Sequence, residues 1–197
     1  MSLQLYFNPQ SRATVTKWVL DELQIEYELV PIDFKQGEHK RPEFLKVNPT
    51  GKLPALKDGE VCVYESVAIA LYLADKFPEA RLAPLPNTPE RGRYLSLMVL
   101  ATSQLEPSMG DYLLKQETPP SRGWIAYDAM RDVIEKEIGD GPYLFGDWFT
   151  VADILIGSMF IWEQVFQREP LRPALAAYVE RLQSRPHGLK FEPSSAQ

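Results

Sequence analysis

The chain has 197 residues, of which 45% are hydrophobic and 24% charged, the balance of an ordinary globular protein of one or two domains. Its net charge of −6 and the lack of any run of Lys or Arg disfavour binding to a nucleic-acid backbone, which requires a concentrated basic face, so we expect no nucleic-acid partner. A single cysteine excludes an internal disulfide and a cysteine-based zinc site. No signal peptide and no stretch of ~20 apolar residues that could span a membrane is visible. Together these observations predict a cytoplasmic protein.

The first part of the chain predicts alternating strands and helices. Leu3, Leu5 and Phe7 alternate with Gln4 and Tyr6, which is the period of a strand. The elements predicted after this strand are a helix over 15–23, a strand over 27–32, a short helix over 42–45, a hairpin of 53–56 and 61–64, and a helix over 69–77. Ser11 is a candidate N-cap for the first helix. Cys62, in the second strand of the hairpin, is expected to be a small core residue. The order βαβ then ββα is similar to the thioredoxin fold.

The remainder of the chain predicts helices only. Four prolines between residues 78 and 89 predict an extended linker. Apolar residues then recur at helical spacing in four segments, namely 95–105 with a bend near Pro107, 124–138, a segment that begins at 149–154, and 175–182. The tail, residues 186–197, shows no periodicity and is expected to be loosely ordered.

The third of these helices has a complete start signal. Thr150 is expected to cap the helix, the Asp153 side chain to reach back to it, and Phe149 to pack on Ile154. Any helix could use this device, so by itself it predicts a helix start and no function.

Residues 51–66 carry the most specific pattern. Pro54 begins a strand, where a proline cannot donate a ladder hydrogen bond, and we expect the Leu53–Pro54 peptide to be cis. The backbone N–H and C=O of Leu53 would then be turned away from the sheet and could pair with a ligand. Glu65 and Ser66 follow at a predicted helix start, which suits a ligand carrying a carboxylate and an ammonium. An ordinary hairpin with a polar helix cap is the alternative.

This block resembles the glutathione site of cytosolic glutathione transferases, and the segment from Leu144 to Asp153 resembles the signature of their buried second-domain helix. The resemblance implies an N-terminal thioredoxin-like α/β domain over 1–77, a linker over 78–89 and an all-α helical bundle over 90–197. It implies a cytoplasmic homodimeric enzyme of detoxification, similar to serine-type bacterial theta, zeta or nu members. Glutathione would be its co-substrate, with no further cofactor and no metal.

The resemblance also implies a set of glutathione-binding residues. In such enzymes a serine after the first strand activates the glutathione thiol, which here is Ser11, with Asn8 and Arg12 as rivals and a plain helix cap as the alternative. The residues expected to hold glutathione are His39, Lys52, Leu53, Pro54, Glu65 and Ser66. The residues expected to contact a small hydrophobic electrophile are Met109, Tyr112 and Trp162, although such side chains more often fill a core.

Three functions remain open at this point. The thiolate of glutathione could add to an electrophile in a transferase reaction, or it could serve an isomerisation or dehalogenation like that of the zeta branch. The zeta branch carries a Ser-Ser-Cys run after the first strand, and residues 9–12 lack it. A non-catalytic transferase-like binding module is the third possibility, which gains weight if Ser11 is only a cap.

Overall fold

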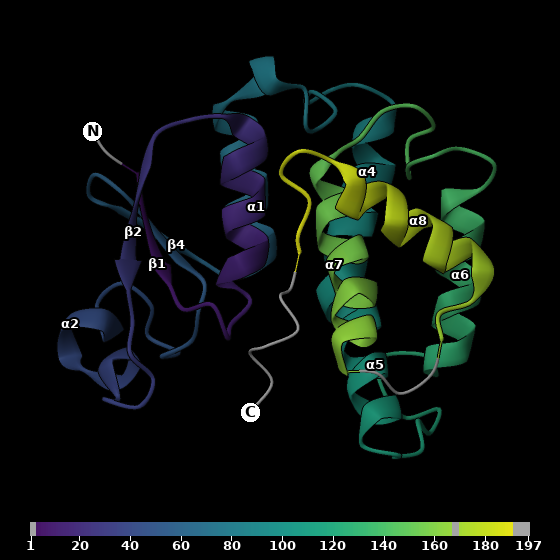
Figure 1. Cartoon of the computed structure of the whole chain (residues 1–197), viewed down its shortest axis with the longest axis horizontal. Coiled ribbons are helices and arrows are strands. Elements are labelled where there is room, and N and C mark those ends of the chain that lie inside the picture. The colour runs from purple at the N-terminus through teal and green to yellow at the C-terminus, as the bar shows by residue number, and fades with distance from the viewer. Residues whose placement is uncertain (1–2, 167–169, 191–197) are drawn as a thin grey trace. The chain divides into compact units, whose positions relative to one another are not determined.

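A computed structural model describes residues 3–166 and 170–190 (Figure 1). The chain divides into two compact units, an N-terminal unit of residues 1–81 and a C-terminal unit of residues 82–197. The prediction for the tail falls largely on residues 191–197, which lie outside the described residues. No helix within the described part of the chain is long and apolar enough to cross a membrane.

The N-terminal unit is a four-stranded mixed sheet with helices, as expected for a thioredoxin-like domain. Its strand order is β2-β1-β3-β4, with β1 parallel to β2 and antiparallel to β3, and β3 antiparallel to β4. The elements are β1 (Leu3–Phe7), α1 (Ala13–Leu23), β2 (Tyr27–Pro31), α2 (Pro42–Leu45), β3 (Ala55–Asp58), β4 (Val61–Tyr64) and α3 (Ser66–Lys76), with short 3-10 turns at Glu38–Lys40 and Pro78–Ala80.

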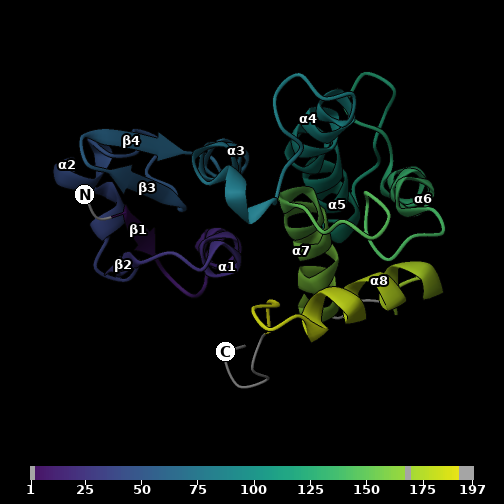
Figure 2. The same ribbon diagram turned by 90° about the horizontal axis from the view of Figure 1, so that it is seen from above.

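Helices α1 and α3 pack together against one face of this sheet (Figure 2). Trp18 of α1 and Leu73 of α3 are fully buried there with Leu5 and Leu56 of the central strands. This is the expected outcome of helical spacing on α1 and α3 and strand alternation on β1 and β3, because each pattern collects its apolar residues on one face.

The prediction that Cys62 is a core residue is wrong, because its side chain is exposed. β4 is an edge strand, and Cys62 is the register partner of Lys57 rather than of the buried Leu56, which faces Val63. Two flanking valines do not indicate which face of an edge strand is buried, because the buried face depends on the register with the neighbouring strand.

The C-terminal unit is all helical, as expected. Its elements are α4 (Glu90–Leu100), a π-helical turn (Ala101–Leu105), α5 (Glu106–Leu113), α6 (Tyr127–Ile138), α7 (Val151–Phe166) and α8 (Pro173–Ser184). α7 is buried along most of its length and packs against α4 and α8 (Figure 1). It is the apolar centre of this unit.

The long helix predicted over 95–105 differs from the observed one in how it is interrupted. The Glu106 N–H donates to the Ala101 carbonyl, five residues back, so the interruption is a π turn that ends before Pro107. Pro107 directly follows the π turn in a helix that runs on from α4, so its missing N–H removes one backbone bond there and its ring favours an irregular turn at this point. Trp124 also lies outside its predicted helix, because α6 begins only at Tyr127.

The predicted helix start at Thr150 and Asp153 is confirmed. The Asp153 carboxylate is fully buried and accepts from the Thr150 N–H at 2.8 Å and the Thr150 hydroxyl at 3.1 Å. It also accepts from the Leu144 N–H at 2.8 Å and the Tyr178 hydroxyl at 2.9 Å, which ties the preceding loop and α8 to α7. Burial raises the pKa of Asp153, although the donors around it favour the ionised form.

Candidate functional site

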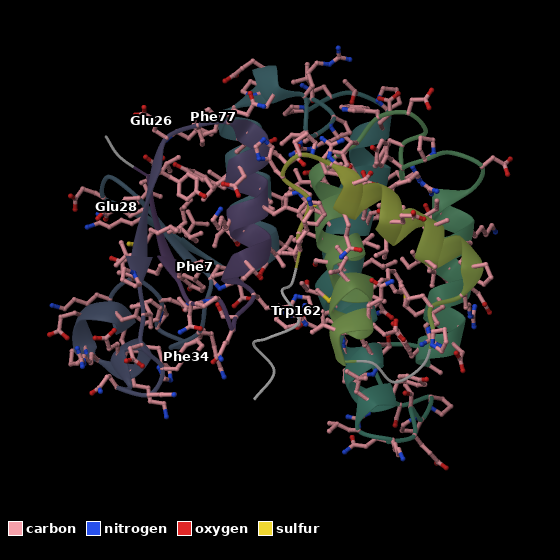
Figure 3. All side chains as sticks on the ribbon, in the orientation of Figure 1. Phe7, Glu26, Glu28, Phe34, Phe77 and Trp162 are labelled. Carbon is pink, nitrogen blue, oxygen red and sulfur yellow. The ribbon has the colours of Figure 1, made fainter. Side chains whose placement is uncertain are left out.

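The strand register brings the predicted glutathione-binding segments to one end of the sheet. Tyr6, near the end of β1, pairs with Ala55 at the start of β3, and Ala55 pairs with Tyr64 at the end of β4. The loops that follow β1, precede β3 and follow β4 therefore meet at the same end. β2 ends there too, because Pro31 pairs with Phe7. In Figure 3 Phe7 lies towards this end of the unit and Glu26, before β2, towards the other.

Ser11 lies in the loop after β1 and is part of the hydrogen bonding that starts α1. Its hydroxyl donates to the Asn8 carbonyl at 2.7 Å and accepts from the Ala13 N–H at 3.2 Å. α1 begins at Ala13 and the residue in the N-cap position is Arg12, whose side chain makes no cap bond. The Ser11 hydroxyl therefore satisfies an N–H group at the helix start as an N-cap side chain does, although Ser11 lies one residue before the N-cap position.

The two rivals of Ser11 have other partners. The Asn8 side-chain amide donates to the Ile32 carbonyl at 2.8 Å, and its oxygen accepts from the Gln10 N–H at 2.9 Å. Asn8 thus holds the loop after β1 against the end of β2. Arg12 is half-buried and also has an interaction of its own.

The Leu53–Pro54 peptide is cis, as expected. Leu53 lies outside the ladder, which begins at Ala55, and its side chain is buried in a cluster that includes Ala13 at the start of α1. The bend is therefore packed next to the loop that carries Ser11.

Asn48 holds the turn before Leu53, a role that the sequence pattern did not reveal. Its side chain is buried, donates to the Lys52 carbonyl at 2.8 Å and accepts from the Thr50 N–H at 3.0 Å. This one amide closes the turn that leads to Leu53. An Asn-Pro-Thr-Gly run is a turn signal, but the sequence does not indicate that the asparagine is buried.

Glu65 and Ser66 lie at the start of α3, as predicted, and each occupies a different position there. Glu65 occupies the N-cap position with φ 72° and makes no side-chain cap bond, while Ser66 is the first helical residue. Positive φ is uncommon for a residue with a side chain and is typical of ligand-binding sites. The exposed Glu65 carboxylate and the first N–H groups of α3 therefore lie beside each other.

His39 and Lys52 lie on the segments between β2 and β3. The His39 ring packs edge-on against Phe34 at 4.9 Å between ring centres, and within the described part of the chain its buried Nδ1 has no hydrogen-bond partner. Gly51, with φ +66°, approaches this histidine, since a Cβ there would lie 3.1 Å from the His39 carbonyl oxygen. The Lys52 residue is exposed.

The three predicted electrophile contacts belong to the C-terminal unit. Met109 and Tyr112 are three residues apart on α5, so they share a face of that helix, with Met109 buried and Tyr112 half-buried. Trp162 is half-buried on α7. Within residues 3–166 and 170–190 no group of three or more His, Cys, Asp or Glu side chains is placed to hold a metal ion.

Comparisons with known proteins identify the family. Residues 1–75 match the family model described as "Glutathione S-transferase, N-terminal domain", and residues 126–186 match "Glutathione S-transferase, C-terminal domain". Glutathione S-transferase 3 of Zea mays is 31% identical over 94% of this chain and 85% of its own length. Disulfide-bond oxidoreductase YfcG of Escherichia coli is 29% identical over 93% of this chain and 91% of its own length.

A solved structure points the same way. The glutathione transferase from Methylococcus capsulatus superposes with a TM-score of 0.80 at 29% identity, over 94% of each chain. The chain therefore belongs to the glutathione S-transferase family and is an enzyme that uses glutathione as its co-substrate.

Proposed function

We propose that the enzyme activates glutathione with the Ser11 hydroxyl and transfers it to small hydrophobic electrophiles. The observation that carries this proposal is the register, which gathers the Ser11 loop, the Leu53–Pro54 bend and the start of α3 at one end of the sheet. A peptide-like ligand lying across that end would meet donors and acceptors from all three segments. This favours a serine-type member of the family.

The sulfur chemistry requires a thiolate. A free thiol titrates near ~8.5, and lowering that value by about two units requires ~2.7 kcal/mol of preferential stabilisation of the anion. The Ser11 hydroxyl and the positive N-terminal end of α1 are two sources of such stabilisation. Because a hydroxyl has one proton, Ser11 would exchange its bond to the Asn8 carbonyl for one to the sulfur while still accepting from the Ala13 N–H.

The rest of glutathione would be held by groups flanking Ser11. The Leu53 backbone would pair with the cysteinyl residue, as a short strand addition next to β3. The first N–H groups of α3 and the Ser66 hydroxyl would receive the γ-glutamyl carboxylate, with the Glu65 carboxylate on its ammonium. His39 and Lys52 would meet the glycine carboxylate, and the buried Nδ1 of His39 is a polar atom still available for such a bond.

The test is the pH dependence of thiolate formation and turnover in wild type and Ser11→Ala. If Ser11 donates to sulfur, the variant should raise the pKa of bound glutathione and lose on the order of 10²-fold in rate near neutral pH, with the loss shrinking as pH rises. Thr14→Ala is the matched control, because it removes a hydroxyl of the same helical turn that donates to the Ser11 carbonyl. Coincident curves for wild type and Ser11→Ala would make Ser11 a structural residue.

A homodimer in the cytoplasm is the assembly we propose. Leu95 and Val99, one turn apart on α4, are 39% and 54% exposed, and they line an open groove of about 460 Å³ with Ser96, Leu100, Ser103 and Gln104. The chain has no charged residue from 94 to 105, so two copies can pair this stripe with itself without burying a charge. Sedimentation of wild type and Val99→Glu tests it, since the variant should be monomeric.

Glutathione-dependent disulfide reduction is a second candidate, favoured by the similarity to YfcG. A glutathione thiolate would attack a disulfide to give a mixed disulfide, and a second glutathione would release the thiol and leave oxidised glutathione. Turnover of a small disulfide by wild type and Cys62→Ser would test it, because the reaction as written needs no protein thiol and should survive that change.

A further inference from the structure

A pocket of about 400 Å³ lies in the C-terminal unit, where the π turn meets the loop of residues 114–126 that joins α5 to α6. Its volume falls within the ~300–1,000 Å³ that is usual for small-molecule sites. Gln104 of the π turn and Arg122, Trp124 and Ile125 of the loop are among the residues that line it. Among the described residues around the pocket, Arg122 alone carries a charge. The pocket is therefore built within one unit, from residues that have no place in the proposed glutathione site.

Asp111 of α5 fixes the wall of this pocket. It is 7% exposed, and one of its carboxylate oxygens accepts from the Trp124 indole N–H at 2.9 Å and from the Thr118 hydroxyl at 3.1 Å. In addition, the Gln104 side-chain amide donates to the Gly123 carbonyl at 2.6 Å. The loop is thus bonded both to α5 and to the π turn. The Trp124 ring is held in place before a ligand binds, which lowers the entropy that binding would cost.

These bonds determine which chemistry the pocket offers. The Trp124 N–H is used by Asp111, so this side chain presents its apolar ring to a ligand. The Arg122 guanidinium lies 5.0 Å from the Trp124 ring centre and 3.8 Å from the Asp111 carboxylate, which is longer than a hydrogen bond. Because Asp111 already accepts two hydrogen bonds from neutral donors, the flat fork of N–H groups on Arg122 is left to bind a further anion.

A purely structural role for the loop leaves its form unexplained. Loops of ~12–15 residues or more without secondary structure are uncommon in compact domains, and many of them bind ligands. Residues 114–126 form a loop of this kind. Ile125 is 43% exposed beside the half-buried Trp124, so the loop leaves apolar surface uncovered at the pocket. The π turn on the facing side is a rare element that is found frequently at functional sites.

We propose that this pocket binds an aromatic carboxylate, with the ring of the ligand packed against Trp124 and Ile125 and its carboxylate paired with the Arg122 guanidinium. An aromatic contact and a two-pronged pair with a carboxylate are the contacts that an indole and a guanidinium make best. Asp111 is a positioning residue, since it acts through the orientation of Trp124. The inference does not depend on the proposed transfer reaction, because none of these residues is assigned to it.

The experiment measures binding of 1-naphthoate and 1-naphthalenemethanol by calorimetry, because the two ligands share a ring system and differ in the carboxylate. Wild type should bind the carboxylate more tightly than the alcohol. Arg122→Gln should weaken binding of 1-naphthoate on the order of tenfold, as expected for the loss of a hydrogen bond between charged groups, and leave binding of the alcohol unchanged. Each titration is repeated with excess S-benzylglutathione, which competes for the glutathione site and should have no effect on 1-naphthoate.

A spectroscopic measurement locates the ligand in wild type, without relying on the folding of a variant. The indole N–H resonance of Trp124, assigned by its absence in Trp124→Phe, should shift when 1-naphthoate is added in heteronuclear NMR spectra. The resonance of Trp18, which is buried in the N-terminal unit, should not shift. Arg172→Gln is the matched control for charge, because it removes an arginine of the same unit that pairs with Asp132 and Glu135 outside the pocket. Its affinity for 1-naphthoate should equal that of wild type.

The outcomes distinguish binding in this pocket from binding elsewhere. Equal affinity of wild type and Arg122→Gln for 1-naphthoate overturns the inference, as does a loss of equal size for both naphthyl ligands, which marks a structural role only. A Trp124 resonance that stays in place while the ligand binds overturns it too. Displacement of 1-naphthoate by S-benzylglutathione would assign the ligand to the glutathione site, and no binding of 1-naphthoate by wild type would leave the pocket without its ligand; either result contradicts the proposal.

Discussion

The hydrogen bonds of Asp153 allow its contribution to stability to be worked out bond by bond. Asp153→Ala would leave four buried donors without a partner, the Leu144 and Thr150 N–H groups and the Thr150 and Tyr178 hydroxyls. At the low end of ~1–3 kcal/mol for each unsatisfied donor, the loss is about 4 kcal/mol. Asp153→Asn keeps an oxygen where Leu144 and Tyr178 donate but presents an NH₂ to the two Thr150 donors, so about half should be lost, ~2 kcal/mol.

The assay is urea unfolding followed by far-ultraviolet circular dichroism, which reports on the helices of the protein. Thr150→Val is the matched control, because it removes one donor and leaves the carboxylate in place, and it should cost about 1 kcal/mol. The expected order of destabilisation is Asp153→Ala, then Asp153→Asn, then Thr150→Val. Equal losses for the alanine and asparagine variants, or losses below about 1 kcal/mol for both, would show that the four bonds do not carry the energy assigned to them.

Three further changes have outcomes that follow from the structure. Ser66→Ala should weaken glutathione binding by ~1.5–3 kcal/mol in calorimetry, as for a bond to a carboxylate, with little change in the chemical step. Asn48→Ala should weaken glutathione binding about tenfold without changing the thiol pKa, because it loosens the turn before Leu53 and leaves the Ser11 loop intact. Asp58→Asn should make the protein less stable to urea near neutral pH. Hydrogen bonds from Lys76 and then Tyr72 hold the pKa of Asp58 below its usual value, so the stability that Asp58 contributes is present above the unfolded pKa of ~3.9. This stability is lost as pH falls through the folded pKa, where variant and wild type should converge.

The parts of the fold that follow from local pattern were predictable. The periodicities of β1 and α1 and the Thr150–Asp153 start signal depend on residues close in sequence, and the structure has each of them. The cis bond at Pro54 was predictable from the proline at the strand start together with the family resemblance, because the proline alone does not require a cis bond.

What the sequence did not reveal depends on partners distant in sequence. Cys62 has the neighbours of a core residue, and its exposure follows from β4 having no strand beyond it. Arg131 and Glu163 look like surface charges on amphipathic helices until α6 and α7 are packed together. Asn48 is buried because the chain folds over it, although its turn signal alone suits a solvent-exposed loop. In each case the sequence does not indicate which helix, strand or loop packs over the residue.

The π turn at Ala101–Leu105 makes the chain tolerant to a change of length in one place. A π turn contains one residue more than an α turn, so deleting a residue there would leave an uninterrupted α-helix through α4 and α5. Because the wider turn already contains the extra residue, the deletion should leave α5 close to its present orientation rather than turn it by the ~100° of one helical residue. Met109 and Tyr112 should keep the face of α5 that they share, and Tyr112 its contact with Arg131. Related chains that differ in length by one residue at this turn should therefore present the same surface of α5.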